Sequence, residues 1–248
     1  MAGRRIALST AVAAAVSMAT IGVALAGDVR GVVELFTSQG CSSCPPADQL
    51  LGELASEPGI VALSLPIDYW DYLGWKDTLA KPRHSARQRG YAQLRGDREV
   101  YTPQVVVNGT VHVMGSDRSA IEMAIANTSH SGPTLSVPVK LALRADALAV
   151  SVGSASASSP PGEVWLCALS KSVPVTIGRG ENHGRTIAYH NVIRRWLKLG
   201  DWSGAARTFN VPATEFAADG VDAVAVLIQG GALESPEIML GAALESIR

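Results

Sequence analysis

Only three of the 248 residues are cysteine: Cys41, Cys44 and Cys167. A finger-type zinc site needs two pairs of ligands, and the third cysteine stands alone. The five histidines are scattered, and none falls at a spacing typical of such a site. The composition therefore argues against a structural zinc site and leaves one close pair of cysteines to be explained.

A strong charge of either sign is also missing. The formal net charge is −1 at pH 7, so the sequence gives no reason to expect binding to nucleic acid or to an anionic membrane surface. Beyond the N-terminus no stretch approaches the length and apolar character of a membrane span. No internal repeat is found. The length suits one large domain or two ordinary domains.

The first 26 residues have the pattern of a signal peptide. Arg4 and Arg5 form a basic start, residues 6–23 are mostly apolar, and Ala24-Leu25-Ala26 fits the small-x-small cleavage pattern. An uncleaved anchor helix is the alternative, but four serine and threonine residues lower the hydrophobicity of the apolar stretch. We predict cleavage after Ala26 and a soluble mature protein that is periplasmic or secreted, where disulfides persist.

The central motif is Cys41-Ser42-Ser43-Cys44, which lies between a predicted strand at 32–36 and a predicted helix at 46–56. Two cysteines three residues apart at the start of a helix share one face of its first turn. The free N–H groups and the helix dipole at that end favour a thiolate over a thiol. A lowered thiol pKa suits disulfide exchange near neutral pH, so strand, turn, CxxC and helix together predict a thioredoxin-type redox motif.

Two other interpretations of this pair stay open. A structural disulfide that closes so short a loop would stabilise the fold by only about 2 kcal/mol, against about 3 kcal/mol for a fifteen-residue loop. The protein would then be a binding or scaffold module rather than an enzyme. An exported copper-handling protein is the weaker option, and it would need His112 or Met114 as a further ligand.

Residues 27–130 alternate strand and helix signals in the order βαβ–α–ββα. This order predicts an α/β thioredoxin-like domain with an insertion after its second strand. The Asn108-Gly109 pair is typical of a hairpin turn between the last two strands. The predicted strands lie at 32–36, 60–67, 104–107 and 110–114, and the predicted helices at 46–56, 82–94 and 119–126.

From Thr134 the hydrophobic pattern changes to a period of two, which is typical of half-buried strands. Residues 134–248 are therefore predicted to form an all-β sandwich domain, joined to the first domain by a linker at 129–133. The fragment 27–127 is expected to fold by itself. The predicted strands lie at 135–143, 148–152, 164–169, 173–177, 187–199, 221–228 and 237–244, and 187–199 suits a helix equally well.

The first domain resembles the thioredoxin superfamily through Cys41-Ser-Ser-Cys44 and Thr102-Pro103. The resemblance implies that Pro103 has a cis peptide bond and faces the CxxC, and that the backbone of Thr102 pairs with a substrate chain. No tryptophan precedes Cys41, where Gln39-Gly40 stand instead. Partner choice therefore need not follow that of thioredoxin.

More closely, the mature chain is similar to a bacterial secreted family described as thioredoxin-like and of unknown function. The family's substrate is not established, so the resemblance implies a redox motif without a partner. The segments that carry this resemblance are 33–48, 68–75, 101–104 and 180–184.

If the CxxC pair is redox-active, Cys41 would attack a substrate disulfide, or be attacked by a substrate thiolate, and Cys44 would resolve the mixed disulfide. Glu34 is a candidate proton relay near Cys44, because a carboxyl on a central strand has a raised pKa and can act as a base. The alternative is a glutamate at a strand edge that faces solvent or a lysine or arginine partner.

The insertion after the second strand is rich in aromatic and basic residues. Its aromatic side chains could line a groove for an extended chain, or they could form the core of a subdomain. Three arginines in the predicted helix at 82–94 could raise the potential near Cys41, although a solvated helix face is the simpler interpretation. The residues concerned are Tyr69, Trp70, Tyr72 and Trp75, and then Arg83, Arg87 and Arg89.

Two features of the second half stand outside the motif. Cys167 lies in an apolar run, which favours a buried inert thiol over a third redox cysteine. The glycine-rich stretch 178–184 lacks the lysine and the following helix of a phosphate-binding loop. We interpret this stretch as a turn that packs on the first domain.

The sequence thus predicts an exported thiol–disulfide oxidoreductase that works through a mixed disulfide, without a metal or an organic cofactor. The expected partners are protein thiols or disulfides, with a membrane or periplasmic redox partner to restore the starting state.

Overall fold

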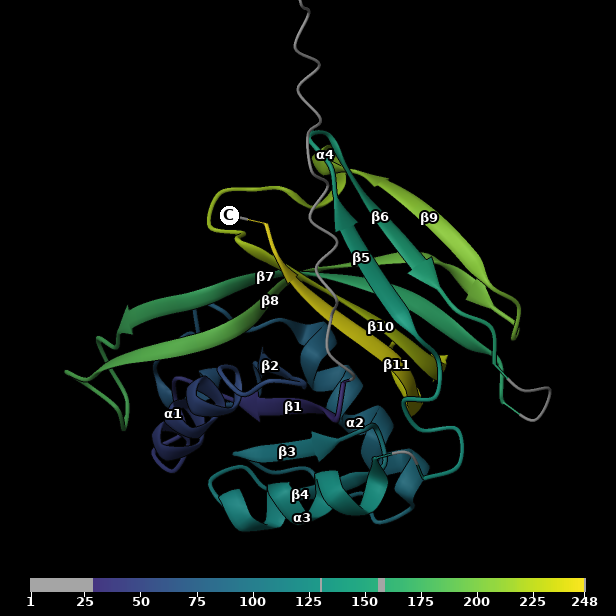
Figure 1. Ribbon diagram of the computed structural model, residues 1–248. Coiled ribbons are helices and arrows are strands. Elements are labelled where there is room, and N and C mark those ends of the chain that lie inside the picture. The colour runs from purple at the N-terminus through teal and green to yellow at the C-terminus, as the bar shows by residue number, and fades with distance from the viewer. Residues whose placement is uncertain (1–28, 130, 156–158, 248) are drawn as a thin grey trace, which may run out of the picture.

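The structure is a computed structural model that describes residues 29–129, 131–155 and 159–247. Two β-sheets and a small set of helices make up the fold (Figure 1). The strands are β1 (Gly31–Thr37), β2 (Ile60–Pro66), β3 (Gln104–Val107), β4 (Val111–Met114), β5 (Val139–Leu143), β6 (Ala147–Val152), β7 (Gly162–Thr176), β8 (Thr186–Trp202), β9 (Arg207–Pro212), β10 (Ala223–Ala232) and β11 (Ser235–Ser246). The helices are α1 (Pro45–Leu54), η1 (Asp71–Leu73), α2 (Pro82–Arg95), α3 (Arg118–Thr128) and α4 (Ala213–Phe216).

The first part of the chain, residues 29–129, forms a sheet covered by helices on both faces. The second part comprises the described residues from 131 onward. β1 is parallel to β2 and antiparallel to β3, and every residue of β1 is buried. Because side chains alternate along a strand, Val33 and Leu35 pack with α1 and α3, whereas Val32 and Phe36 face α2. The strands and helices predicted for this part are present, with shifted ends.

This sheet does not stop at the end of the first part. β2 pairs with β8 in parallel at Ser64 and Val192, and the Asn191 side chain donates a hydrogen bond to the carbonyl of Ala62 at 2.9 Å. The result is one mixed sheet of eight strands in the order β11-β10-β7-β8-β2-β1-β3-β4. The predicted fold class, an α/β thioredoxin-like domain followed by a separate β-sandwich, is therefore wrong.

The cause of this error is the length of two strands. Runs that the sequence suggests as separate strands, 164–169 and 173–177, belong to the single 15-residue strand β7. Its partner β8 has 17 residues, and register shifts within the pair let both strands bend. Figure 1 shows this β7–β8 hairpin (green) reaching over α1, where it joins the two parts of the chain.

A shared hydrophobic core lies on the α2 face of the large sheet. It combines Phe36 and Leu65 from the first part with Trp196 and Leu227 from the second. The predicted boundary at 130–134 falls between α3 and β5, so it separates elements in sequence while the core remains common. Whether the two parts fold separately stays a prediction.

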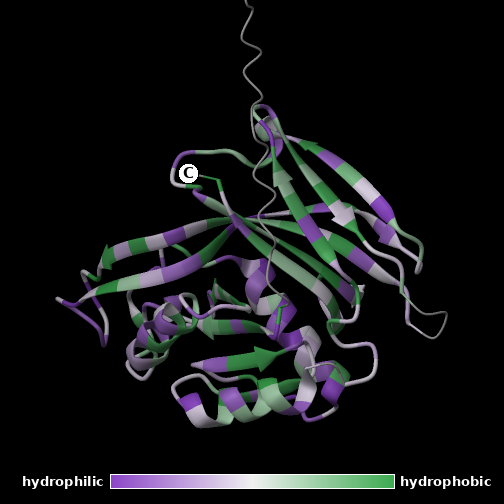
Figure 2. Cartoon of the chain, viewed as in Figure 1, coloured by the Kyte–Doolittle hydropathy of each residue, from purple (hydrophilic) through white to green (hydrophobic). Residues whose placement is uncertain are grey.

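The smaller sheet, in the order β5-β6-β9, covers the other face of the second half of the large sheet. Hydrophobic and hydrophilic residues alternate along its strands in Figure 2, as the period-two pattern predicted. Its inward side chains, such as Leu148 and Val150, pack against Leu166 and Val226 of the large sheet. This sandwich-like layer shares its larger sheet with the first part of the chain.

Within the described ranges, the structure has no helix that is long and apolar enough to cross a membrane. The predicted signal peptide, residues 1–26, lies outside these ranges.

Candidate redox site

A disulfide joins Cys41 and Cys44, with their Cα atoms 5.4 Å apart. Cys44 is the N-cap of α1, and Pro45 and Pro46 open the helix, where a missing backbone N–H costs nothing. The N–H of Cys44 donates to the carbonyl of Cys41 at 3.2 Å, which closes the turn. Cys41 is 5% exposed and Cys44 is 0% exposed, so Cys41 is the more accessible of two nearly buried cysteine residues.

The Thr102–Pro103 peptide lies beside this disulfide and is cis, as predicted. The Ser43 hydroxyl is 3.4 Å from the Cys41 sulfur and 3.5 Å from the Thr102 carbonyl oxygen. A Cβ atom on Gly115 would lie 3.0 Å from Pro103 and 3.2 Å from Ala47 of α1. The structure therefore brings Cys41, Thr102 and Pro103 to one place.

Glu34 is not part of this group. Its carboxylate faces α2, where it accepts two hydrogen bonds from Arg87, at 2.7 and 3.0 Å, and one from the Tyr91 hydroxyl. The neighbouring Leu35 packs with α1 on the opposite face of β1. The arginine partner of the alternative interpretation is present, but Glu34 lies fully buried on the interior strand β1 and not at a strand edge. Its hydrogen bonds go to α2 and give no support to a proton relay at Cys44.

Asp48 is the carboxyl that sequence reasoning missed. It lies on α1 one turn after Cys44, and its N–H donates to the carbonyl of Cys44 at 3.1 Å. The side chain is 1% exposed, and neither carboxyl oxygen has a hydrogen-bond partner among the described residues. The four-residue spacing in Cys-Pro-Pro-Ala-Asp could have revealed it, because such residues share a helix face.

Burial raises the pKa of Asp48 well above its usual value. The Thr37 hydroxyl offsets part of this rise, although its geometry falls short of a hydrogen bond, and the Asp77 carboxylate adds to the rise. Asp48 is therefore a buried acid that favours its neutral form next to the buried cysteine.

The insertion after β2 forms one wall of the site. The Gln39 side-chain oxygen accepts hydrogen bonds from the Trp75 ring at 2.8 Å and from the Thr78 N–H at 3.2 Å. The Gln39 N–H donates to Asp77 at 2.8 Å. Burial raises the pKa of Asp77 to about 6, against the lowering effect of its backbone hydrogen bonds. Gln39 therefore connects the insertion to the loop between β1 and α1, residues 38–44, which is called the cysteine loop below.

The aromatic residues of the insertion divide between packing and exposure. Trp70 donates to the Thr102 hydroxyl at 2.8 Å, and its Cβ would lie 3.4 Å from a Cβ on Gly40. Tyr72 stacks on Trp70 with ring centroids 6.2 Å apart and is 76% exposed. Trp70 thus links the insertion to the cis peptide, while Tyr72 stacks on the outer side of Trp70 and is exposed to solvent.

The glycine-rich stretch 178–184, which connects β7 and β8, packs on the cysteine loop, as predicted. Asn182 donates one hydrogen bond to the carbonyl of Gln39 at 3.0 Å and another to that of Cys41 at 2.8 Å. The Glu181 carboxylate accepts a hydrogen bond from the N–H of Ser42 at 3.3 Å. The second part of the chain therefore completes the surroundings of the disulfide.

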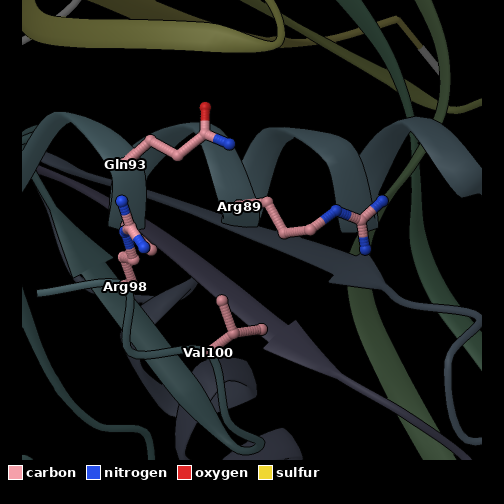
Figure 3. Close-up of a pocket in the computed structure, with 5 residues that line it drawn as sticks. Arg89, Gln93, Arg98 and Val100 are labelled. Atoms are coloured by element: carbon pink, nitrogen blue, oxygen red, sulfur yellow. The ribbon is translucent and has the colours of Figure 1, made fainter. Parts of the chain in front are cut away.

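The arginines of α2 lie elsewhere. Arg87 is buried with Glu34, and Arg83 forms an exposed ion pair with Glu234 at 3.4 Å. Arg89 lines a surface pocket of ≈ 480 Å³ together with Arg98, and Figure 3 shows its side chain running along α2 away from that residue. These positions give no support to the idea that the arginines raise the potential at Cys41.

The remaining candidates are also placed. Cys167 on β7 is a fully buried free thiol, and burial raises its pKa well above the usual value, as expected of an inert cysteine. Of the two candidate copper ligands, His112 has its Nδ1 atom 3.1 Å from the Tyr101 hydroxyl oxygen, and Met114 is 48% exposed. In the part of the chain that the structure describes, no three His, Cys, Asp or Glu side chains gather as a metal site would require.

The structure thus defines a class of protein in which a CxxC disulfide at the start of α1 is combined with one mixed sheet of eight strands. Residues 32–229 match the family described as protein of unknown function (DUF1223), and the chain belongs to this family. A similar solved structure is the crystal structure of a protein from Agrobacterium tumefaciens, which is 34% identical, with a TM-score of 0.78 over 88% of this chain and 94% of that chain. No curated protein matches the sequence closely.

Proposed function

We propose that this protein is a thiol–disulfide oxidoreductase and that the Cys41–Cys44 disulfide is its reactive group. The observation that carries the proposal is the position of Cys41, which is the more exposed cysteine of the pair and lies in the turn before α1. Its sulfur contacts the Ser43 hydroxyl, which in turn contacts the Thr102 carbonyl. The positive end of the helix dipole favours a thiolate, which is the reactive form in exchange. In α1 this support comes from the dipole, because Pro45 and Pro46 have no N–H and the N–H groups of Ala47 and Asp48 donate to the Cys44 carbonyl.

The oxidised protein would react in two balanced steps. A substrate thiolate attacks the Cys41 sulfur, the Cys41–Cys44 bond breaks, and Cys44 leaves as a thiolate while a mixed disulfide forms. A second substrate thiol, as its thiolate, attacks the substrate sulfur of the mixed disulfide. This releases the substrate disulfide and leaves Cys41 as a thiolate. Two electrons pass from the substrate thiols to the protein, and the reverse sequence reduces a substrate disulfide.

Asp48 would donate a proton to Cys44 and later accept it back. Its neutral carboxyl can protonate the Cys44 thiolate as that sulfur leaves, and the resulting carboxylate can take the proton back when Cys44 attacks a mixed disulfide. The support is its burial, its missing hydrogen bonds and its place one turn from Cys44 on the same helix face.

A structural role for the disulfide is the second candidate. The observation that favours it is the 5% exposure of Cys41, which is low for a sulfur that must meet a protein substrate. In that case the protein is a binding module and Tyr72, 76% exposed, belongs to its working surface.

We also propose that the protein acts in the periplasm or outside the cell, on protein thiols or disulfides, with a redox partner that restores its starting state. The signal-peptide pattern in residues 1–26 supports this. Mass spectrometry of the exported protein should find Gly27 at the N-terminus. A mature chain that still carries residues 1–26 would contradict the proposal.

Trapping of mixed disulfides tests the proposed reaction. Cys44→Ser leaves Cys41 without its resolving partner, so this variant should accumulate covalent partners in the compartment where the protein acts. Cys41→Ser is the matched control, because it keeps a single cysteine of the pair in the more buried position and should trap few partners or none. Equal trapping by both variants, or by neither, would favour the structural disulfide.

A further inference from the structure

The stretch 178–184, here called the clamp loop, has an unusual relation to the cysteines. It lies about 140 residues further along the chain, as the sequence separations of 139 to 143 between its contacts show. Three hydrogen bonds join its side chains to backbone groups of the cysteine loop, at Gln39, Cys41 and Ser42. Contacts to the backbone hold a loop in shape whatever side chains it carries.

Asn182 is held in one orientation. The side chain is buried at 1% exposure, its amide nitrogen donates to two carbonyls, and its amide oxygen accepts from Arg185 at 3.0 Å. The clamp loop itself is closed by a hydrogen bond from the Gly184 N–H to the Ile177 carbonyl at 2.8 Å. A buried amide with all these partners fixes the geometry that it contacts.

The clamp loop also packs closely against Trp75 of the insertion. A Cβ atom on Gly178 would lie 3.0 Å from the Trp75 ring, and that ring donates its N–H to Gln39. The cysteine loop is therefore held from both sides, by Trp75 through the Gln39 side chain and by Asn182 through the Gln39 carbonyl.

Glu181 brings a negative charge to this place. Its carboxylate accepts a hydrogen bond from the N–H of Ser42, the residue that directly follows Cys41. A thiolate formed at Cys41 would therefore meet a nearby like charge and would lose one backbone donor. Other titratable and charged groups on the elements around the cysteine loop are Asp71 and Asp77 of the insertion, Asp48 of α1, and Arg185 and Tyr189 of the β7–β8 hairpin. The clamp loop itself also carries Arg179 and His183, which are both exposed.

We propose that the clamp loop is a positioning element of the redox site, in which Asn182 fixes the cysteine loop and the charge of Glu181 makes Cys41 harder to ionise. The inference deepens the proposed function and rests on it. The second part of the chain then sets how reactive the cysteine of the first part is.

The test measures alkylation of reduced full-length protein by iodoacetamide across a range of pH, with peptide mass spectrometry to locate the label on Cys41. Glu181→Gln keeps an acceptor for the Ser42 N–H and removes only the charge. Below the midpoint it should raise the rate at Cys41 about threefold, as the midpoint moves about half a unit to lower pH. Glu53→Gln is the matched control, because Glu53 is an exposed glutamate that pairs with Arg118 near the far end of α1.

Asn182→Ala tests the geometric part. It should raise the alkylation rate at every pH, because the cysteine loop loses the two hydrogen bonds that hold the carbonyls of Gln39 and Cys41 in place. An unchanged midpoint in Glu181→Gln, or an equal shift in Glu53→Gln, would overturn the inference even if Asn182→Ala does not fold. A midpoint shift without any partner trapped by Cys44→Ser would leave the clamp standing and reject the proposed exchange reaction.

Discussion

Arg87 of α2 binds Glu34 of β1 through two hydrogen bonds, at 2.7 and 3.0 Å, and both side chains are 1% exposed. The same guanidinium donates to the Gln229 side chain at 2.6 Å and to the Leu233 carbonyl at 3.1 Å. Glu34 belongs to the first part of the chain and the other two acceptors to the second. One arginine therefore ties the two parts together inside their shared core.

Replacing this arginine should destabilise the protein strongly. Arg87→Leu leaves the Glu34 carboxylate buried without a partner, which typically costs about 3–5 kcal/mol. Urea unfolding followed by fluorescence would measure the loss. Arg83→Leu is the matched control on the same helix, because its ion pair with Glu234 is about half exposed and such pairs contribute about 0–1 kcal/mol. Equal losses from both variants would contradict the buried-pair account.

The local elements around the cysteines could be predicted from the sequence. Proline at the start of α1, a buried strand before the turn and the Asn108-Gly109 hairpin are local signals, and each is present in the structure. The pairing of β2 with β8 could not be predicted, because it rests on one residue pair, Ser64 and Val192, that is far apart in sequence.

The candidate site shows the same limit. Glu34 and Asp48 are both buried acids near the motif. The helix spacing could place Asp48 one turn after Cys44, whereas only the fold shows that Glu34 faces α2 and Arg87. On β1 a shift of one residue moves a side chain to the other face of the sheet, so the sequence left the position of Glu34 open. Asn182 contacts the carbonyl of Cys41 across a separation of 141 residues, which no local pattern encodes.

Asp48 should make the stability of the oxidised protein depend on pH. Its folded-state pKa is raised, so between about pH 4 and that value the folded state holds a proton that the unfolded state has lost. Stability therefore falls as the pH rises from about 4 toward the folded-state pKa, by about 1.4 kcal/mol for each unit of pKa difference. Asp48→Asn removes the titrating group, so the loss of unfolding free energy between pH 4.5 and pH 7.5, two buffers chosen for the comparison, should become smaller.

Comparison with the unmodified protein isolates this effect. The pKa of Asp77, raised to about 6, gives a fall in stability with rising pH, whereas that of His84, lowered to about 4, gives an increase. His84 is present in both proteins, so its contribution cancels in the difference. Asp77 interacts with Asp48, so the difference reports Asp48 together with this interaction. Asp219→Asn, at an exposed position, is the matched control and should leave the pH dependence unchanged. Identical pH profiles for Asp48→Asn and the unmodified protein would contradict the burial of a neutral acid.

The predicted division of the chain can be tested with the fragment 27–127. Removing the second part exposes core residues such as Phe36 and Leu65, and Arg87 loses its contacts with Gln229 and Leu233. We therefore expect the fragment to unfold at a lower urea concentration than the full chain, or to lack a cooperative transition. A cooperative transition at any urea midpoint would show that the first part folds by itself, as the sequence pattern predicted. A midpoint equal to that of the full chain would contradict the stabilisation by the shared core.

The docking of α2 on the second part makes the final prediction. Glycine to alanine inside a helix normally stabilises a protein by roughly 0.5–1 kcal/mol, because alanine loses less backbone entropy on folding. At Gly90 of α2, however, a Cβ atom would lie 2.2 Å from the backbone carbonyl oxygen of Glu234 and 2.8 Å from Pro236. Gly90→Ala should therefore destabilise the protein by about 1–3 kcal/mol, since the whole turn before β11 would have to move.

Gly52 of α1 offers the matched comparison, because a Cβ there would lie 2.6 Å from the ring of His190, a half-buried side chain that can rotate away. Gly52→Ala should cost less than Gly90→Ala in urea unfolding, and combining it with His190→Ala should recover the usual gain of roughly 0.5–1 kcal/mol. No single side-chain truncation can relieve the clash at Gly90, because the obstacle there is a backbone oxygen. If Gly90→Ala proved as stable as the unmodified protein, α2 could not pack against the β10–β11 turn at this distance. That result would contradict the close contact between the two parts of the chain at Gly90.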